Sequence, residues 1–311
     1  MTMANRTTVP EPSASSESID PVLTALYDNN SDPRNQADLR TLQQLSAEAF
    51  ADPGIQVDTW RWGTGQHDWV HCFKPRQSAS RLPALLFVHG GRWQLNTSLE
   101  TSFWAHACAQ QNWAMVSINF GPLSESFRLE DQIGAVRAAL DAVRNGADHL
   151  VLDHERLAVA GHSSGAHLAL AACLAQPSTS DEHRARGNQT FNSPWRALLL
   201  VGGLYDLGPL TRTRFQGSLN FSDAELACCS PLASLAETRS HHLPEVMVAV
   251  GEQETSEFRR QSRALFDVLS PQAQASWFEV PKTAHFDAPL EFNRPVSLMR
   301  AFISRHLGDR E

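Results

Sequence analysis

The sequence predicts an α/β fold, in which helices cover both faces of a mostly parallel β-sheet. From residue 83 onward, short apolar runs typical of buried strands alternate with longer segments whose apolar residues recur at helical spacing. Such alternation is typical of parallel sheets with helices packed on both sides. A length of 311 residues and a hydrophobic content of 42% are consistent with one large core.

The expected elements follow in order from the N-terminus. Residues 1–20 are polar and rich in Ser, Pro and Glu, and we expect a disordered tail there, followed by a single domain over residues 21–311. Helices are expected over residues 33–50, 98–112, 129–146, 164–175, 256–269 and 291–306. An antiparallel pair of strands is expected at 55–62 and 68–73, and further strands at 83–89, 114–119, 156–160, 196–202, 245–250 and 275–280. Residues 206–240 interrupt the alternation and predict a short, cap-like helical insertion over the site.

A serine-centred pentapeptide, Gly161-His162-Ser163-Ser164-Gly165, lies between an expected strand and an expected helix. A serine hydroxyl is a weak nucleophile, and it needs a sharp turn that lifts its oxygen clear of the backbone and leaves room for a base. The two glycines supply that room, and a strand–turn–helix context is where the G-x-S-x-G motif forms a nucleophile elbow. Ser163 is therefore the predicted nucleophile.

A second apolar strand, Leu85–Val88, runs directly into a His-Gly-Gly sequence that ends at Gly91. Acyl transfer places negative charge on the carbonyl oxygen, and backbone N–H donors must approach that oxygen closely. Side chains at positions 90 and 91 would obstruct the approach. The predicted oxyanion hole consists of the N–H groups of Gly90, Gly91 and Ser164.

The base and the acid are expected after the nucleophile, in the order acid and then histidine. His285 follows the last expected strand, on the loop where a base would stand, and is the predicted general base. Glu254 lies on the loop after the preceding strand, and is the predicted acid that orients the imidazole. Three other carboxylates remain rivals for that role: Asp206, Glu252 and Glu257.

Six short motifs resemble those of the arylformamidase (kynurenine formamidase) branch of the α/β-hydrolase superfamily. In chain order they are His89-Gly90-Gly91-x-Trp93, residues 161–167 (GHSSGAH), 203–207 (GLYDL), Ser230-Pro231, 257–262 (EFRRQS) and His285-Phe286-Asp287. Residues 27–30 (YDNN) are similar to an N-terminal segment of that branch. The resemblance implies the α/β-hydrolase fold and hydrolysis of an aryl formamide such as N-formylkynurenine, a step of tryptophan catabolism.

Three positions depart from the pattern of that branch. Arg92 stands where the branch carries an aromatic or small residue, and residues 119–122 (NFGP) replace a segment of the N-Y-R-L-A-P type. Glu254 stands where many relatives have Asp, but either carboxylate can orient a histidine. The first two departures lie near the expected mouth of the pocket, so they leave hydrolysis intact and leave the substrate open.

Aromatic residues next to the catalytic elements are candidates for substrate binding, because an apolar wall excludes water. They are Trp93, Phe120, Tyr205 and Phe286, and the resemblance adds Tyr27, which stands in the YDNN segment. Packing in the core is the alternative for each of them. Arg92 would suit a substrate that carries a carboxylate, since an Arg–carboxylate contact is directional and often bidentate; the alternative is an arginine that faces solvent.

Composition excludes several other classes of function. A net charge of −8 and a pI near 5.9 argue against nucleic acid or an anionic membrane as a partner. The five cysteines lack metal-type spacing and predict reduced core thiols; adjacent Cys228 and Cys229 could form a redox pair, but packing is favoured. With no targeting segment evident, we expect a cytoplasmic protein with a small-molecule substrate, no metal and no cofactor. A homodimer remains open.

Three functions follow from these residues. The favoured one is a metal-independent serine hydrolase that cleaves an aryl formamide, and the alternative within catalysis is a carboxylesterase on small aryl or alkyl esters. A non-catalytic binding protein on the same fold is an alternative of another class. Because Ser163, Glu254 and His285 are all present, we favour catalysis.

Overall fold

The computed structural model describes residues 19–78, 80–175, 193–237, 243–271 and 275–308. Within these residues, eight strands form one sheet in the order β1-β2-β4-β3-β5-β6-β7-β8. The strands are β1 (Ile55–Arg61), β2 (Trp69–Pro75), β3 (Leu82–Val88), β4 (Ala114–Ile118), β5 (Leu152–His162), β6 (Ala197–Val201), β7 (Glu245–Gly251) and β8 (Ala275–Val280). β2 pairs antiparallel with β1 and with β4, and all other pairs are parallel. The predicted α/β fold with a mostly parallel sheet is confirmed.

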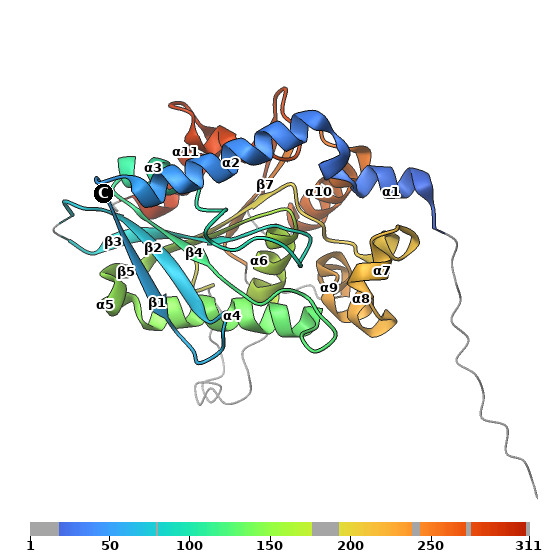
Figure 1. Ribbon diagram of the computed structural model, residues 1–311, viewed down its shortest axis with the longest axis horizontal. Helices are drawn as coiled ribbons and strands as arrows, with labels where there is room; N and C mark the ends of the chain where they lie inside the picture. Colours follow the sequence, from blue (N-terminus) through green and yellow to red (C-terminus); the bar gives the residue numbers. More distant parts are fainter. Residues whose placement is uncertain (1–18, 79, 176–192, 238–242, 272–274, 309–311) are drawn as a thin grey trace, which may run out of the picture.

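Helices cover both faces of this sheet. They are α1 (Pro21–Tyr27), α2 (Pro33–Ala51), α3 (Ala105–Gln110), α4 (Leu129–Asn145), α5 (Ala147–Leu150), α6 (Ser164–Leu174), α7 (Gln216–Leu219), α8 (Asp223–Cys229), α9 (Pro231–Glu237), α10 (Ser256–Leu269) and α11 (Leu298–Leu307), with 3₁₀ turns η1 (Asn29–Ser31), η3 (Gly208–Arg212) and η4 (Ala288–Asn293). α2, α3 and α11 lie on one side of the sheet, and α4 and α6 lie on the other (Figure 1).

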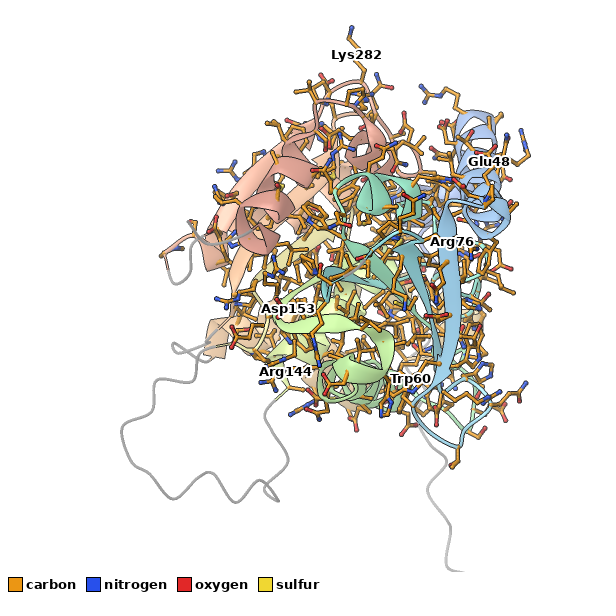
Figure 2. The ribbon with its side chains drawn as sticks, turned by 90° about the vertical axis from the view of Figure 1, so that its left-hand side faces the viewer. Glu48, Trp60, Arg76, Arg144, Asp153 and Lys282 are labelled. Carbon is orange, nitrogen blue, oxygen red and sulfur yellow. The ribbon has the colours of Figure 1, made fainter. Side chains whose placement is uncertain are left out.

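Each face of the sheet has its own hydrophobic core, because alternate strand residues point to opposite faces. On β3, Leu86 and Val88 belong to the core under α4 and α6, whereas Leu85 and Phe87 belong to the core under α3 and α11. All seven residues of β3 are buried, as expected for a central parallel strand. The two edges lie far apart: Trp60 on β1 and Lys282, which follows β8, are at opposite ends of the view in Figure 2.

Two expected helices are shorter than predicted. The helix expected at 98–112 covers only Ala105–Gln110, because the hydroxyls of Thr101 and Ser102 donate to backbone carbonyls four residues earlier and hold a series of turns. The helix expected at 291–306 begins at Leu298. Pro295 precedes it, and the Ser297 hydroxyl accepts a hydrogen bond from the N–H of Arg300, which caps the helix at that point.

Helix α1, which precedes the sheet in the chain, packs against η3 and α10 in the C-terminal half. The backbone N–H of Asp20 donates to the carbonyl of Arg212, and the Asp20 carboxylate caps α1. The hydroxyl of Tyr27 donates to Glu257 on α10 over 2.8 Å. Of the predicted tail, residues 1–18 lie outside the described residues, and so do residues 176–192. No described helix is both long enough and apolar enough to cross a membrane.

Candidate active site

Ser163 occupies a strained turn between β5 and α6. Its backbone angles are φ 57° and ψ −129°, a conformation that residues with a side chain rarely adopt. The flanking glycines make the turn possible: a Cβ atom at Gly161 would lie 2.4 Å from the carbonyl oxygen of Gly165, and one at Gly165 would lie 2.2 Å from that of Val88. The sequence therefore folds locally into the predicted elbow, with the half-buried Ser163 side chain facing a cavity.

His285 and Glu254 meet Ser163 from the loops after β8 and β7. The Nε2 atom of His285 lies 2.9 Å from Ser163 Oγ, and its Nδ1 atom lies 2.8 Å from Glu254 Oε2. The other oxygen of Glu254 accepts a hydrogen bond of 3.3 Å from the N–H of Gly251. A carboxylate at Nδ1 favours the tautomer with its proton there, which leaves Nε2 free to accept the serine proton.

The three rival carboxylates have other partners. Glu252 accepts the backbone N–H of Lys282, and Glu257 accepts the hydroxyl of Tyr27. Asp206 lies 3.5 Å from the guanidinium of Arg260. The structure thus brings the predicted acid, and none of its rivals, to the predicted base.

The three predicted oxyanion donors face the same cavity as Ser163. Ser164 is the first residue of α6, where a backbone N–H has no partner within the helix. The N–H groups of Gly90 and Gly91 likewise donate to no acceptor among the described residues. A Cβ atom at Gly90 would lie 2.7 Å from the carbonyl oxygen of His162, so only glycine allows this approach. The residues that carry the three predicted donors therefore line the same cavity as the predicted nucleophile.

The cavity in front of Ser163 has a volume of about 100 Å³ and is lined by several parts of the chain. Two of them are residues 90–93, named the oxyanion loop for their predicted role, and the elbow at Ser163. Leu210 and Phe215 reach it from the segment between β6 and β7, and Phe258 reaches it from α10. Another wall comes from the segment before the sheet, in which Asn29, Asn30 and Gln43 contribute amide groups. The pocket therefore combines apolar surface with a polar side.

Four of the predicted substrate-binding residues line this cavity: Tyr27, Arg92, Trp93 and Phe286. Two hydrogen bonds also hold Trp93 in place. Its indole N–H donates to His167 Nδ1 over 3.2 Å, and its backbone N–H donates to Ser164 Oγ over 3.2 Å. It supports the oxyanion loop as well as the wall.

Two predictions are corrected, since Phe120 and Tyr205 do not line the cavity. Phe120 stacks flat on the imidazole of His89, with ring centroids 4.1 Å apart, and is buried beside the oxyanion loop. Tyr205 is fully buried in the core, and its backbone N–H donates to Gln261 Oε1 over 2.6 Å. Packing, the alternative for both, is what the structure shows.

Arg92 has a left-handed backbone with φ 51°, and its guanidinium carbon lies 4.0 Å from the centroid of the Phe215 ring. Its Nη2 atom is 3.9 Å from a carboxylate oxygen of Asp28, which also pairs with Arg214. The side chain is only 27% exposed. Arg92 is therefore a partly buried cation at the cavity wall rather than a solvent-facing arginine.

Two residues at the site, His162 and Gly202, were not predicted from the sequence to have a role there. The His162 imidazole lies at the cavity wall beside the ring of His285, with centroids 4.7 Å apart. Gly202 has φ 53°, and a Cβ atom there would lie 2.6 Å from Glu254 Oε1. The end of β6 must therefore be glycine to admit the carboxylate. The glycine directly after an apolar strand was the available indication.

The sequence is similar to known families over most of its length. The BD-FAE family model matches residues 70–218, which include the oxyanion loop and the elbow. A kynurenine formamidase from Danio rerio is 26% identical over 227 residues, covering 72% of this chain and 73% of the relative. One from Drosophila melanogaster is 26% identical over 255 residues, covering 80% and 81%. The predicted resemblance to this branch is confirmed.

Solved structures share the fold. A proposed thioesterase from Silicibacter sp. TM1040 has a TM-score of 0.72 at 22% identity, covering 91% of this chain and 98% of its own. A hyperthermophilic esterase from Pyrobaculum calidifontis has a TM-score of 0.61 at 19% identity, covering 93% and 96%. The α/β-hydrolase fold is therefore confirmed.

Proposed function

This chain is a hydrolase of the α/β-hydrolase fold that resembles kynurenine formamidases, and we propose that it cleaves an aryl formamide such as N-formylkynurenine by acyl transfer through Ser163, His285 and Glu254. The observation that carries the proposal is the continuous pair of hydrogen bonds, 2.9 Å and 2.8 Å long, that joins the serine oxygen to the imidazole and the imidazole to the carboxylate. A binding protein without catalysis would not need this arrangement.

The first step forms a formyl-enzyme. His285 Nε2 accepts the proton of Ser163 as the serine oxygen attacks the formyl carbon, and the imidazolium is stabilised by Glu254. The carbonyl oxygen becomes negative and is bound by the N–H groups of the oxyanion hole, each worth about 2.7–4 kcal/mol of transition-state stabilisation. The C–N bond then breaks, and His285 gives its proton to the leaving aryl amine.

The second step releases formate. A water molecule loses a proton to His285 as its oxygen attacks the formyl-enzyme, and the same N–H groups bind the second oxyanion. The serine–carbonyl bond breaks, and the proton returns to Ser163 Oγ. A serine nucleophile and a histidine base supply both steps, so the proposed mechanism needs no metal.

Ester hydrolysis is the second candidate, because the same machinery cleaves an acyl–oxygen bond and structural neighbours are described as esterases. The partly buried guanidinium of Arg92 and the amides on the other wall favour a polar substrate that carries a carboxylate. This feature supports the formamide, since formylkynurenine has such a group.

A substrate comparison tests the proposal. Purified protein is assayed on N-formylkynurenine and on a series of short p-nitrophenyl esters, and kcat/KM is compared, with the Ser163→Ala variant as the control for hydrolysis by impurities. We expect the formamide to be preferred. Preference for the esters would replace the formamidase by a carboxylesterase, and absence of turnover on every substrate would favour a binding protein.

A further inference from the structure

Two adjacent cysteines at the end of α8 face the start of α4. The Sγ atoms of Cys228 and Cys229 lie 3.4 Å apart, and Cys228 Sγ lies 2.8 Å from a carboxylate oxygen of Glu130. Glu130 and Cys228 are exposed, and Cys229 is buried. In the described part of the chain, this is the one group of at least three His, Cys, Asp or Glu side chains whose ligand atoms all lie within 4.8 Å of one another. None of the three residues lines the catalytic cavity.

These three side chains suit a soft metal ion. Zinc binds cysteine sulfur at about 2.3 Å and carboxylate oxygen at about 2.0–2.2 Å, so two sulfurs on one ion can lie up to about 4.6 Å apart. The observed separations fall within that span. Two thiolates and one carboxylate leave a fourth position for water, and the exposed side of the cluster gives an ion access. All five cysteines of the chain are free, so both sulfurs are available.

We propose that Glu130, Cys228 and Cys229 form a binding site for a thiophilic divalent cation such as Zn²⁺ or Cd²⁺, separate from the catalytic centre. As each sulfur–metal bond forms, its thiol releases one proton to solvent, whereas Glu130 binds as the carboxylate. No oxidant is involved. The ion takes part in no bond-making or bond-breaking step of the proposed hydrolysis.

The site is connected to the oxyanion loop. The backbone carbonyl of Cys229 accepts a hydrogen bond of 2.7 Å from His167 Nε2, and His167 Nδ1 accepts one from the Trp93 indole. Since Nδ1 accepts from the indole, Nε2 carries the proton that is donated to the carbonyl. Cys229 is only 3% exposed, and we expect an ion bound between its sulfur, Cys228 and Glu130 to draw it toward the surface and shift its carbonyl. We therefore expect a bound ion to weaken the support of Trp93 and to reduce turnover, a consequence that rests on the proposed function.

Cadmium titration of the full chain tests the site, because cadmium–thiolate bonds absorb in the ultraviolet and exposed histidines do not contribute to that band. We expect one ion per chain, and an affinity lower by about tenfold or more in Cys228→Ser and in Glu130→Gln. Cys173→Ser, which removes a half-buried cysteine on α6, is the matched control and should bind as the unmodified chain does. Equal binding by the unmodified chain and Cys228→Ser would overturn the site.

Turnover separates the site from its consequence. We expect hydrolysis to fall as the ion binds in the unmodified chain and in Cys173→Ser, to persist in Cys228→Ser, and to return when a chelator removes the ion. Unchanged turnover at full occupancy would overturn the connection to the oxyanion loop and leave the metal site standing. A chain that binds cadmium but hydrolyses none of the substrates would contradict the proposed function instead.

Discussion

The Nε2 atom of His162 lies 2.9 Å from the backbone carbonyl oxygen of His285. Burial, and the nearby His285 ring, lower the pKa of His162 well below its usual value, so the ring is neutral and Nε2 carries the donated proton. The residue before the nucleophile therefore holds the backbone of the base. Through this bond the elbow and the loop after β8 keep a fixed distance.

We expect His162→Leu to lower kcat by up to roughly tenfold with little change in KM, because one neutral hydrogen bond contributes about 0.5–1.5 kcal/mol. His162→Gln retains an N–H donor and should recover most of the loss. Steady-state kinetics on both variants make the comparison. An equal decrease in the two would mean that the ring packing, and not the hydrogen bond, positions His285.

Alanine at either Ser163 or His285 should lower kcat by about 10⁴-fold or more while substrate affinity changes little, because these groups act on the transition state. Glu254→Ala should cost roughly one or two powers of ten less. Glu252→Ala, on the same loop, is the control and should retain full activity. If Ser163→Ala remains fully active, the acyl-transfer scheme is wrong.

Gly90→Ala should lower kcat by about 10²–10³-fold, the usual effect of losing one oxyanion donor. The new methyl group would lie 2.7 Å from the His162 carbonyl and 2.9 Å from Ser163 Cβ, so the loop must retreat. Gly134→Ala is the matched control, because no atom lies within 4 Å of its new methyl group. Within a helix this second change should raise stability by about 0.5–1 kcal/mol. Steady-state kinetics and thermal unfolding are measured for both variants. Full activity of Gly90→Ala would contradict a role of this loop in the mechanism.

Arg92→Ala should raise KM about tenfold for an aryl formamide that carries a carboxylate, and should leave KM for a neutral ester little changed. The reason is that the lost contact stabilises the ground state and the transition state to the same extent, and the removal of such a contact raises KM. Arg214→Ala removes the other arginine paired with Asp28 without removing a cavity residue, and serves as the control. KM and kcat are measured for both variants on both substrates. Equal effects on the two substrates would assign Arg92 a structural role and favour the esterase.

Stability should decline as the pH falls from about 6.5 to about 4, because His167 has a folded-state pKa of about 4 against an ordinary value of 6.5. In this window the unfolded chain binds more protons than the folded chain does. The contribution of His167 to the free energy of unfolding is therefore fully present above pH 6.5 and is lost as the pH falls to about 4. The free energy of unfolding is measured with urea at several pH values in this range. Its slope against pH should be smaller in His167→Gln by up to about 1.4 kcal/mol per pH unit.

The exposed His154→Gln substitution is the matched control for this pH dependence. His89 has a similarly lowered pKa, because it is buried, so some slope should remain in His167→Gln. An unchanged slope in His167→Gln would show that the His167 ring is already protonated in the folded protein.

Local patterns predicted most of the sheet and the three proposed catalytic residues, because each follows an apolar strand. β5 leads to Ser163, β7 to Glu254 and β8 to His285, and a parallel sheet brings such strand ends together. The limits of α3 and α11 were missed because Ser and Thr hydroxyls and a proline act on a few residues only, within segments that otherwise have helical spacing.

Long-range relations were not accessible to the same reasoning. Nothing near Phe120 in the sequence indicates that His89 will stack on it. The polar wall of the cavity comes from residues before the sheet, far in sequence from the elbow. Glu130 and Cys228 are 98 residues apart, so their proximity could not be inferred from cysteine spacing.

The hydrogen bond between Tyr27 and Glu257 has a consequence for the order of folding during synthesis. The two residues are 230 positions apart, so α1 leaves the ribosome long before its partner helix α10 exists. Domains acquire structure from the N-terminal side as the chain emerges, but a pairing of such high sequence separation forms only after the intervening loop closes. The cavity wall that contains Tyr27 is therefore synthesised first, but it reaches its final position last. A nascent chain can possess the elbow and the oxyanion loop while its pocket is still open on one side, and the complete pocket is reached only when α10 has been synthesised.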